Sequence, residues 1–225
     1  HRRREQEKAK STLRTRGRMT PEHVRLVSFY TALKNLLHTD KYLAVSDFLS
    51  FQKEFADIFQ FFSIQKNANT LAFYCEKNDL QEKWVNRFIE IYSELNNSNI
   101  TPQLIAKHNK AFIAHKLESE KTYLDNILHK VDPAIKLDDE QRNVVLCDED
   151  YTLVVAGAGA GKTTTVAAKV KYLVEKQGIK PEQILVISFT NKAVGELKDK
   201  INKSLGIPCP VTTFHSTGYA ILRKK

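Results

Sequence analysis

Apolar residues recur every three or four positions through the first part of the chain, up to about residue 131. This spacing places them on one side of a helix and predicts a succession of amphipathic helices. Thr-Pro pairs at 20–21 and 101–102 are typical helix starts, and the second opens one long helix that ends at the Asp-Pro pair 132–133. The polar run 96–99 predicts a loop before it. The pattern therefore predicts an all-α region over residues 19–130.

An aromatic stripe stands out within these helices. Its members repeat at a spacing of three or four residues: Phe48, Phe51, Phe55, Phe59 and Phe62. Such a stripe lines one helical face with rings and usually forms a core. A groove for a partner protein, or a platform on which bases stack, is the alternative interpretation.

The pattern changes after residue 131. Short apolar runs at 153–155, 184–188 and 211–213 have the length of buried strands, and helical spacing returns between them. Strands that alternate with helices form βαβ units with a parallel sheet. We therefore predict a basic arm over residues 1–18, an all-α domain over 19–130 and part of an α/β domain over 131–225.

The net charge of +9 is concentrated at the start of the chain. Residues 1–18 hold eight Lys or Arg and two Glu. A basic arm of this kind can grip nucleic-acid phosphates or an acidic membrane surface, although a solvated helix end is an equally good interpretation. The face of the later helix that carries Lys107, His108, Lys110, His115 and Lys116 leaves the same two interpretations open.

Composition narrows the class of protein further. No apolar run approaches the length of a membrane span, so we expect a soluble protein with no membrane partner. The three cysteines, Cys75, Cys147 and Cys209, are widely spaced, and no signal sequence accompanies them. Neither a disulfide framework nor a zinc cluster is indicated, and a reducing cytoplasm fits best.

The small-residue loop Ala156–Thr163 carries the most specific chemistry. It reads Ala-Gly-Ala-Gly-Ala-Gly-Lys-Thr between a predicted strand and a predicted helix, which is the P-loop pattern with Ala156 in place of its first Gly. Glycines let backbone N–H groups turn inward around an anion at the start of a helix. We predict that Lys162 reaches the β- and γ-phosphates of ATP and that Thr163 places its hydroxyl on Mg²⁺.

A glutamine before the loop is a candidate for recognition of the adenine base. Gln141 lies in a short predicted helix over 137–142, for which Asp138 is a good N-cap. An amide can donate to one edge of adenine and accept from its amine, although any exposed glutamine has the same pattern. The predicted nucleotide-binding set is Gln141, Ala158, Gly159, Ala160, Gly161, Lys162, Thr163 and Thr164.

Two predicted strands end in an aromatic residue beside small polar residues. In a parallel sheet these carboxyl ends share an edge with the phosphate loop. Rings suit stacking on bases, and the polar groups suit phosphates, so we predict contacts with single-stranded DNA. The predicted set is Phe189, Thr190, Asn191, Lys192, Thr213, Phe214, His215 and Ser216. For His215, a packing role is an equal alternative.

Four segments in this order resemble the first motifs of UvrD/Rep-type superfamily 1 DNA helicases: 137–142, 156–163, 188–193 and 213–216. Residues 107–113 also resemble the segment that precedes the motor in the helicase IV branch. The resemblance implies a RecA-like fold for 131–225, the first part of motor domain 1A. It further implies ATP and Mg²⁺ as cofactors, Lys162 and Thr163 as catalytic residues, single-stranded DNA as partner and a role in DNA repair.

The resemblance also shows departures from the family pattern. Many relatives carry Arg after the Gly-Lys-Thr, where this chain has Thr164. The Walker B acidic motif and the second RecA-like domain would follow residue 225. We therefore expect a fragment of an ATP-dependent helicase that binds nucleotide but hydrolyses it poorly.

Two other functions stay open at this point. A related motor could remodel RNA polymerase and use the amino-terminal helices as an arm for its protein partner. A small P-loop kinase or ATP-sensing switch is a different class, in which the segments after the loop would bind a small acceptor. The Phe-Thr-Asn-Lys and Thr-Phe-His-Ser segments argue against that class.

Overall fold

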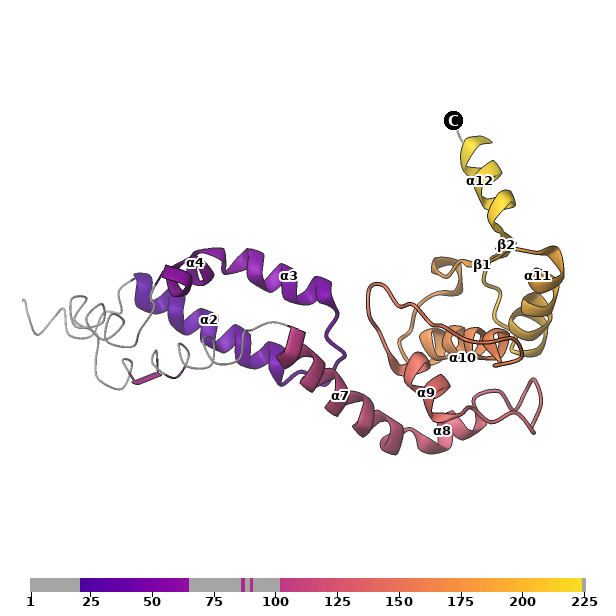
Figure 1. Cartoon of the computed structure of the whole chain (residues 1–225), viewed down its shortest axis with the longest axis horizontal. Coiled ribbons are helices and arrows are strands. Elements are labelled where there is room, and N and C mark those ends of the chain that lie inside the picture. Colours follow the sequence, from indigo (N-terminus) through magenta and orange to yellow (C-terminus); the bar gives the residue numbers. More distant parts are fainter. Residues whose placement is uncertain (1–20, 65–85, 88–89, 91–101, 224–225) are drawn as a thin grey trace, which may run out of the picture. The chain divides into compact units, whose positions relative to one another are not determined.

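The computed structural model describes residues 21–64, 86–87, 90 and 102–223 (Figure 1). The described residues fall into two compact units, which divide between Asn109 and Lys110. The domain boundary at residue 131 stays a prediction, because by contacts residues 110–130 group with the second unit. Leu124, Ile127 and Leu128 are buried in the core of that unit. The basic arm 1–18 lies outside the described residues.

The first unit is helical around a cluster of phenylalanine rings. Helix α2 spans Pro21–Leu37, α3 spans Val45–Glu54 and α4 spans Ala56–Ile64, while α7, Pro102–Ser119, begins in this unit. Phe29 is fully buried, with ring centroids 5.4 Å from both Phe51 and Phe55 and 5.8 Å from Phe59. The predicted aromatic core is confirmed for Phe48, Phe51, Phe55 and Phe59; the side chain of Phe62 lies outside the described part.

The connection after α2 is held by two side chains of α7. The ring nitrogens of His108 lie 3.1 Å from the Leu37 carbonyl oxygen and 2.8 Å from that of Lys41. Next to it, the Asn109 amide accepts from the N–H of Leu43 and donates to its carbonyl, both at 2.9 Å. His108 therefore stabilises the local fold, and contact of this helical face with a phosphate backbone stays a prediction.

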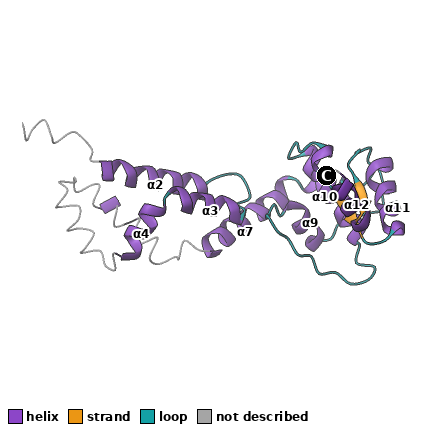
Figure 2. Cartoon of the chain, turned by 90° about the horizontal axis from the view of Figure 1, so that it is seen from above, coloured by secondary structure: helices purple, strands orange, loops and turns teal. Residues whose placement is uncertain are grey.

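The second unit surrounds helix α10, Lys162–Glu175 (Figure 2). The elements that accompany it are α8, Lys121–Asn126; α9, Asp139–Leu146; the 3-10 turn η1, Pro181–Gln183; β1, Val186–Ser188; α11, Asn191–Lys198; the π-helix η2, Asp199–Ser204; β2, Val211–Thr213; and α12, Phe214–Arg223. The single long helix predicted from 101 to 132 is two helices, because the chain leaves helical geometry at Glu120.

The sheet is smaller than predicted. Strands β1 and β2 pair in parallel, with Val186 opposite Val211 and Ser188 opposite Thr213, so two predicted strands and their direction are confirmed. The third, at 153–155, is wrong, since this segment is irregular and the exposed fractions of Leu153 and Val155 are 88% and 89%. A strand requires a hydrogen-bonded neighbour, and no described strand pairs with this segment. The unit is mostly helical, with a parallel pair consistent with part of a P-loop domain.

Two lysines anchor α10 to its neighbours. Lys169 Nζ donates to the carbonyl oxygens of Val145 and Cys147, at the end of α9. Lys171 Nζ donates to the Ile127 carbonyl at 2.8 Å. These bonds satisfy carbonyls that a helix end leaves without partners, and burial lowers the pKa of Lys169. None of the described helices is both long enough and apolar enough to cross a bilayer.

Candidate functional site

The loop before α10 has the geometry that its glycines permit. Gly159 and Gly161 have φ values of 78° and 74°, in the left-handed region, and Gly161 is the N-cap of α10. A Cβ atom at Gly161 would lie only 2.7 Å from Nε2 of Gln141. The backbone angle therefore requires glycine at this position, and a larger residue would also displace the Gln141 amide.

The Lys162 side chain folds back over this loop. Its Nζ donates to the carbonyl oxygens of Ala156 at 3.1 Å and Gly157 at 2.6 Å. The residue is exposed, so the ammonium is accessible from solvent. Two neutral carbonyls are weaker partners for an ammonium than anionic oxygens, so this group can exchange its loop contacts for a phosphate.

Three threonines follow Lys162 in the first turn of α10. Thr163, the predicted Mg²⁺ ligand, is half-buried there. The Thr165 hydroxyl is buried and donates to the Gly161 carbonyl at 3.2 Å, which stabilises the turn. Thr164 Oγ1 accepts a 3.2 Å bond from Lys200 Nζ in η2. Sequence reasoning missed Lys200, because nothing in its local pattern indicates a partner 36 residues away.

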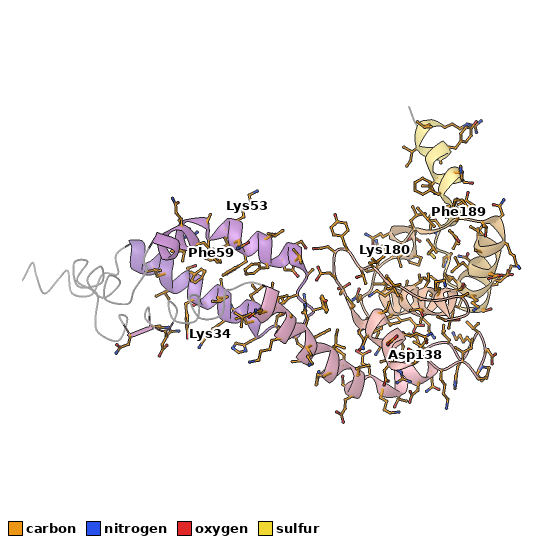
Figure 3. All side chains as sticks on the ribbon, viewed as in Figure 1. Lys34, Lys53, Phe59, Asp138, Lys180 and Phe189 are labelled. Carbon is orange, nitrogen blue, oxygen red and sulfur yellow. The ribbon has the colours of Figure 1, made fainter. Side chains whose placement is uncertain are left out.

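Gln141 lies beside the loop, as the prediction requires. It forms a reciprocal cap with Asp138: the Gln141 N–H donates to Asp138 Oδ1 at 2.8 Å, and the Asp138 N–H donates to Gln141 Oε1 at 3.1 Å. The predicted N-cap role of Asp138, labelled in Figure 3, is confirmed. Gln141 Nε2 also donates to the Ala160 carbonyl at 3.3 Å. Both ends of the amide are thus engaged in the described structure, and adenine recognition stays a prediction.

The two strand ends carry exposed aromatic rings. The exposed fraction is 81% for Phe189, labelled in Figure 3, and 69% for Phe214. The Phe189 ring lies 6.4 Å from the His215 ring between centroids, which brings the two predicted segments together. Parallel pairing of β1 and β2 accounts for this meeting, because the carboxyl ends of both strands lie at one edge.

The polar members of these segments divide into two groups. Thr190 Oγ1 caps α11 by accepting from the Ala193 N–H at 3.2 Å, and buried Thr213 exchanges hydrogen bonds with Ser216. These three side chains shape the turns that present the rings. Asn191, Lys192 and His215 are exposed and accessible to a ligand.

Comparison with known proteins finds similarity within the second unit. Residues 137–225 match the UvrD/REP helicase N-terminal domain. The chain is 42% identical over 91 residues to a probable DNA helicase II homolog of Mycoplasma capricolum, a match that covers 39% of this chain and 12% of that protein. It is 40% identical over 93 residues to the ATP-dependent DNA helicase UvrD1 of Mycobacterium leprae, covering 40% of this chain and 12% of the relative.

A third relative gives the same picture. The ATP-dependent DNA helicase PcrA of Staphylococcus aureus is 39% identical over 88 residues, which is 38% of this chain and 12% of PcrA. The chain thus spans about an eighth of the length of these relatives. The family match over 137–225 includes the loop, Gln141 and both strand ends.

Proposed function

We propose that this chain, whose residues 137–225 belong to the UvrD/REP helicase family, is the ATP-binding portion of an ATP-dependent helicase or translocase that acts on single-stranded DNA. One observation supports this most strongly. The glycine loop, the Lys162 ammonium and the Gln141 amide come together at the start of α10, although Gln141 lies 21 residues before Lys162 in sequence. Two of the similar proteins, UvrD1 and PcrA, are named as ATP-dependent DNA helicases.

The residues at this helix start have the chemistry that a magnesium nucleotide needs. The backbone N–H groups of 158–164 and the positive end of α10 favour the phosphates. Lys162 leaves the loop carbonyls and contacts the β- and γ-phosphates, and the Thr163 hydroxyl is an oxygen ligand of the kind that Mg²⁺ takes. When bound, Mg²⁺ neutralises phosphate charge. Gln141 orients the adenine through its amide.

The exposed rings at the strand ends form the DNA side of the proposal. Phe189 and Phe214 present stacking faces, while Lys192 and His215 supply polar contacts to the strand. Stacking of a base on an aromatic side chain contributes about 1–3 kcal/mol. Two stacking faces at one sheet edge suit successive bases of a strand, so their exposure supports a nucleic-acid motor over a small P-loop kinase or switch.

These 225 residues should bind ATP without turning it over efficiently. Loss of arginine-type charge stabilisation lowers the rate of phosphoryl transfer by about 10³–10⁵. In the helicase family that charge comes from a second motor domain. Near-normal, DNA-stimulated hydrolysis by this chain alone would contradict the proposal.

Binding of a fluorescent ATP analogue, with and without Mg²⁺, tests the nucleotide site. Lys162→Ala should weaken binding by roughly 100-fold or more, because a charge-assisted contact to phosphate is lost. Lys198→Ala, at an exposed lysine of α11, is the matched control and should bind as the wild type does. Equal binding by Lys162→Ala and the wild type would defeat the assignment.

The salt dependence of the affinity for single-stranded DNA tests the DNA-binding part of the proposal. Contacts to the phosphates of a single strand make the logarithm of affinity fall linearly with the logarithm of salt concentration. Phe189→Ala and Phe214→Ala should weaken affinity while leaving that slope unchanged, since they remove stacking and no charge. An affinity that does not depend on salt would favour the small-molecule switch.

A further inference from the structure

A lysine from a distant part of the sequence reaches the first turn of α10. Lys200 belongs to η2, and its Nζ donates to Thr164 Oγ1 at 3.2 Å. Thr164 directly follows the two residues proposed for the phosphates and Mg²⁺. The ammonium of Lys200 is therefore one side chain away from the proposed phosphate site.

The packing around Gly161 places Thr164 on the same side as Gln141. A Cβ atom built on Gly161 would meet Gln141 Nε2 at 2.7 Å and Thr164 Cβ at 3.9 Å. Gln141, Gly161, Thr164 and Lys200 thus follow one another in a continuous series of neighbours. Lys200 stands at the end of this series.

The backbone at Lys200 is specialised. The N–H of Leu205 donates to the Lys200 carbonyl at 3.0 Å, five residues back, so α11 widens here into a π-helical turn. Such turns are rare and occur frequently at functional sites. This turn holds Lys200 half-buried against α10.

The ammonium of Lys200 has a different kind of partner from the ammonium of its neighbour Lys203. Lys203 forms a 2.7 Å ion pair with Asp199, one turn back along η2. Among the described residues, no carboxylate forms an ion pair with Lys200, whose hydrogen bond goes to the neutral Thr164 hydroxyl. A half-buried cation with a neutral partner can still bind an anion.

We propose that Lys200 and Thr164 together form an additional contact to the phosphates of the bound nucleotide. This inference rests on the function proposed for the loop. The Thr164 hydroxyl accepts from Lys200 and so keeps its own proton for donation to a phosphate oxygen. The Lys200 ammonium stabilises the phosphate charge from behind Thr164. The pair thereby adds a cation from η2 to the one that Lys162 supplies.

Lys200→Met tests the contact, because methionine keeps an apolar stem and removes the charge. Affinity for a fluorescent ATP analogue with Mg²⁺ should fall roughly tenfold. Lys200→Arg should stay within about threefold of the wild type, since the charge is retained. Lys203→Met, on the same turn, is the matched control and should leave affinity unchanged. Thermal unfolding without nucleotide verifies that each variant is folded.

Thr164→Val provides a second test that does not alter Lys200. It should weaken ATP binding about as much as Lys200→Met does, and the double variant should be no weaker than either single variant, since the two side chains act as one unit. Binding by Lys200→Met within twofold of the wild type, while Lys162→Ala fails to bind, overturns this inference alone. Failure of Lys200→Arg to restore affinity also overturns it. Failure of the wild type to bind overturns the proposed function and this inference together.

Discussion

The two units use phenylalanine in opposite ways. In the first unit Phe29 and Phe55 are fully buried, and their ring centroids lie 5.4 Å apart in an edge-on arrangement. In the second unit Phe189 and Phe214 stand at the ends of β1 and β2 with exposed fractions of 81% and 69%. The same side chain therefore stabilises one unit and stays accessible on the other.

The difference follows from where each ring lies on its element. Rings spaced by three or four residues share a helical face, so each ring covers the next and water is excluded. A ring directly after a short strand has no such neighbours on its own element. Leaving a phenylalanine exposed forgoes about 2 kcal/mol of burial, so Phe189 and Phe214 contribute little to the stability of their unit.

The largest difference in stability should appear between the loss of a buried ring in the first unit and the loss of an exposed ring in the second. Phe55→Ala should lower the free energy of unfolding of the first unit by about 3–5 kcal/mol, because it leaves a cavity beside the rings of Phe29 and Phe51. Phe189→Ala should change the unfolding free energy of the second unit by less than about 0.5 kcal/mol. Urea unfolding followed by circular dichroism measures both. Equal losses would break the contrast between the two units.

A smaller effect on stability is expected from the pH dependence of a buried tyrosine in the second unit. Burial, followed by the charges of Glu120 and Asp148, raises the pKa of Tyr172 to about 12. The folded state keeps this proton while the unfolded state releases it near pH 10, so the contribution is intact below pH 10 and is lost as the pH rises toward 12. At pH 12 the loss amounts to about 2 kcal/mol.

Tyr172→Phe tests this by keeping the ring and removing the titrating hydroxyl. The variant should lose less stability than the wild type between pH 10 and 12, as measured by urea unfolding at each pH. Identical pH profiles would show that the interior around Tyr172 is as open to water as the strand ends.

A still smaller loss of stability is expected from a substitution in the glycine-rich loop before α10. Gly161→Ala should lower the free energy of unfolding by about 1–2 kcal/mol, because alanine is strained at a φ of 74°. Binding of the ATP analogue should fall with it. Gly157→Ala is the matched control for stability, since a Cβ there meets nothing within 4 Å and its φ is outside the left-handed region. An equal loss of unfolding free energy in Gly157→Ala and Gly161→Ala would contradict the explanation from the backbone angle of Gly161.

The smallest effect returns to the first unit. The Arg25 guanidinium forms a two-pronged ion pair with Asp57 and lies 4.4 Å above the Phe55 ring. The hydrogen bond from Arg25 lowers the pKa of Asp57, so the pair stabilises the unit above the usual range of an aspartate and weakens as the pH falls below about 4.

Asp57→Asn should therefore cost less than about 1 kcal/mol at pH 7, since both partners are well exposed to solvent. The gap between variant and wild type should close in acid unfolding experiments. A gap that persists at pH 2 would assign the effect to packing around Arg25 and not to charge.

Local patterns were sufficient for much of this structure. The three-to-four spacing predicted the buried face of Phe48 to Phe55, and Asp138 was recognised as the cap of α9. The glycine spacing predicted the turn before α10. These features depend on residues within about one helical turn of each other, so sequence neighbours carry the information.

The errors lie where partners are remote. The run 153–155 has the composition of a buried strand yet is exposed, because a strand exists only when another strand supplies its hydrogen bonds. The face that carries His108 could not be assigned from its charges, since its partners are carbonyls 67 and 71 residues away. The helix over 101–132 breaks at Glu120, which the apolar spacing does not mark.

By itself the sequence determined the glycine-rich loop before α10, the helical aromatic core and the order of the motifs, because each depends on spacings of a few residues. Only the tertiary structure decided that Gln141 reaches the loop, that Phe189 and His215 meet, and that Lys200 bonds to Thr164. Such contacts depend on how strands pair and helices pack, and these arrangements bring together residues that no local pattern connects.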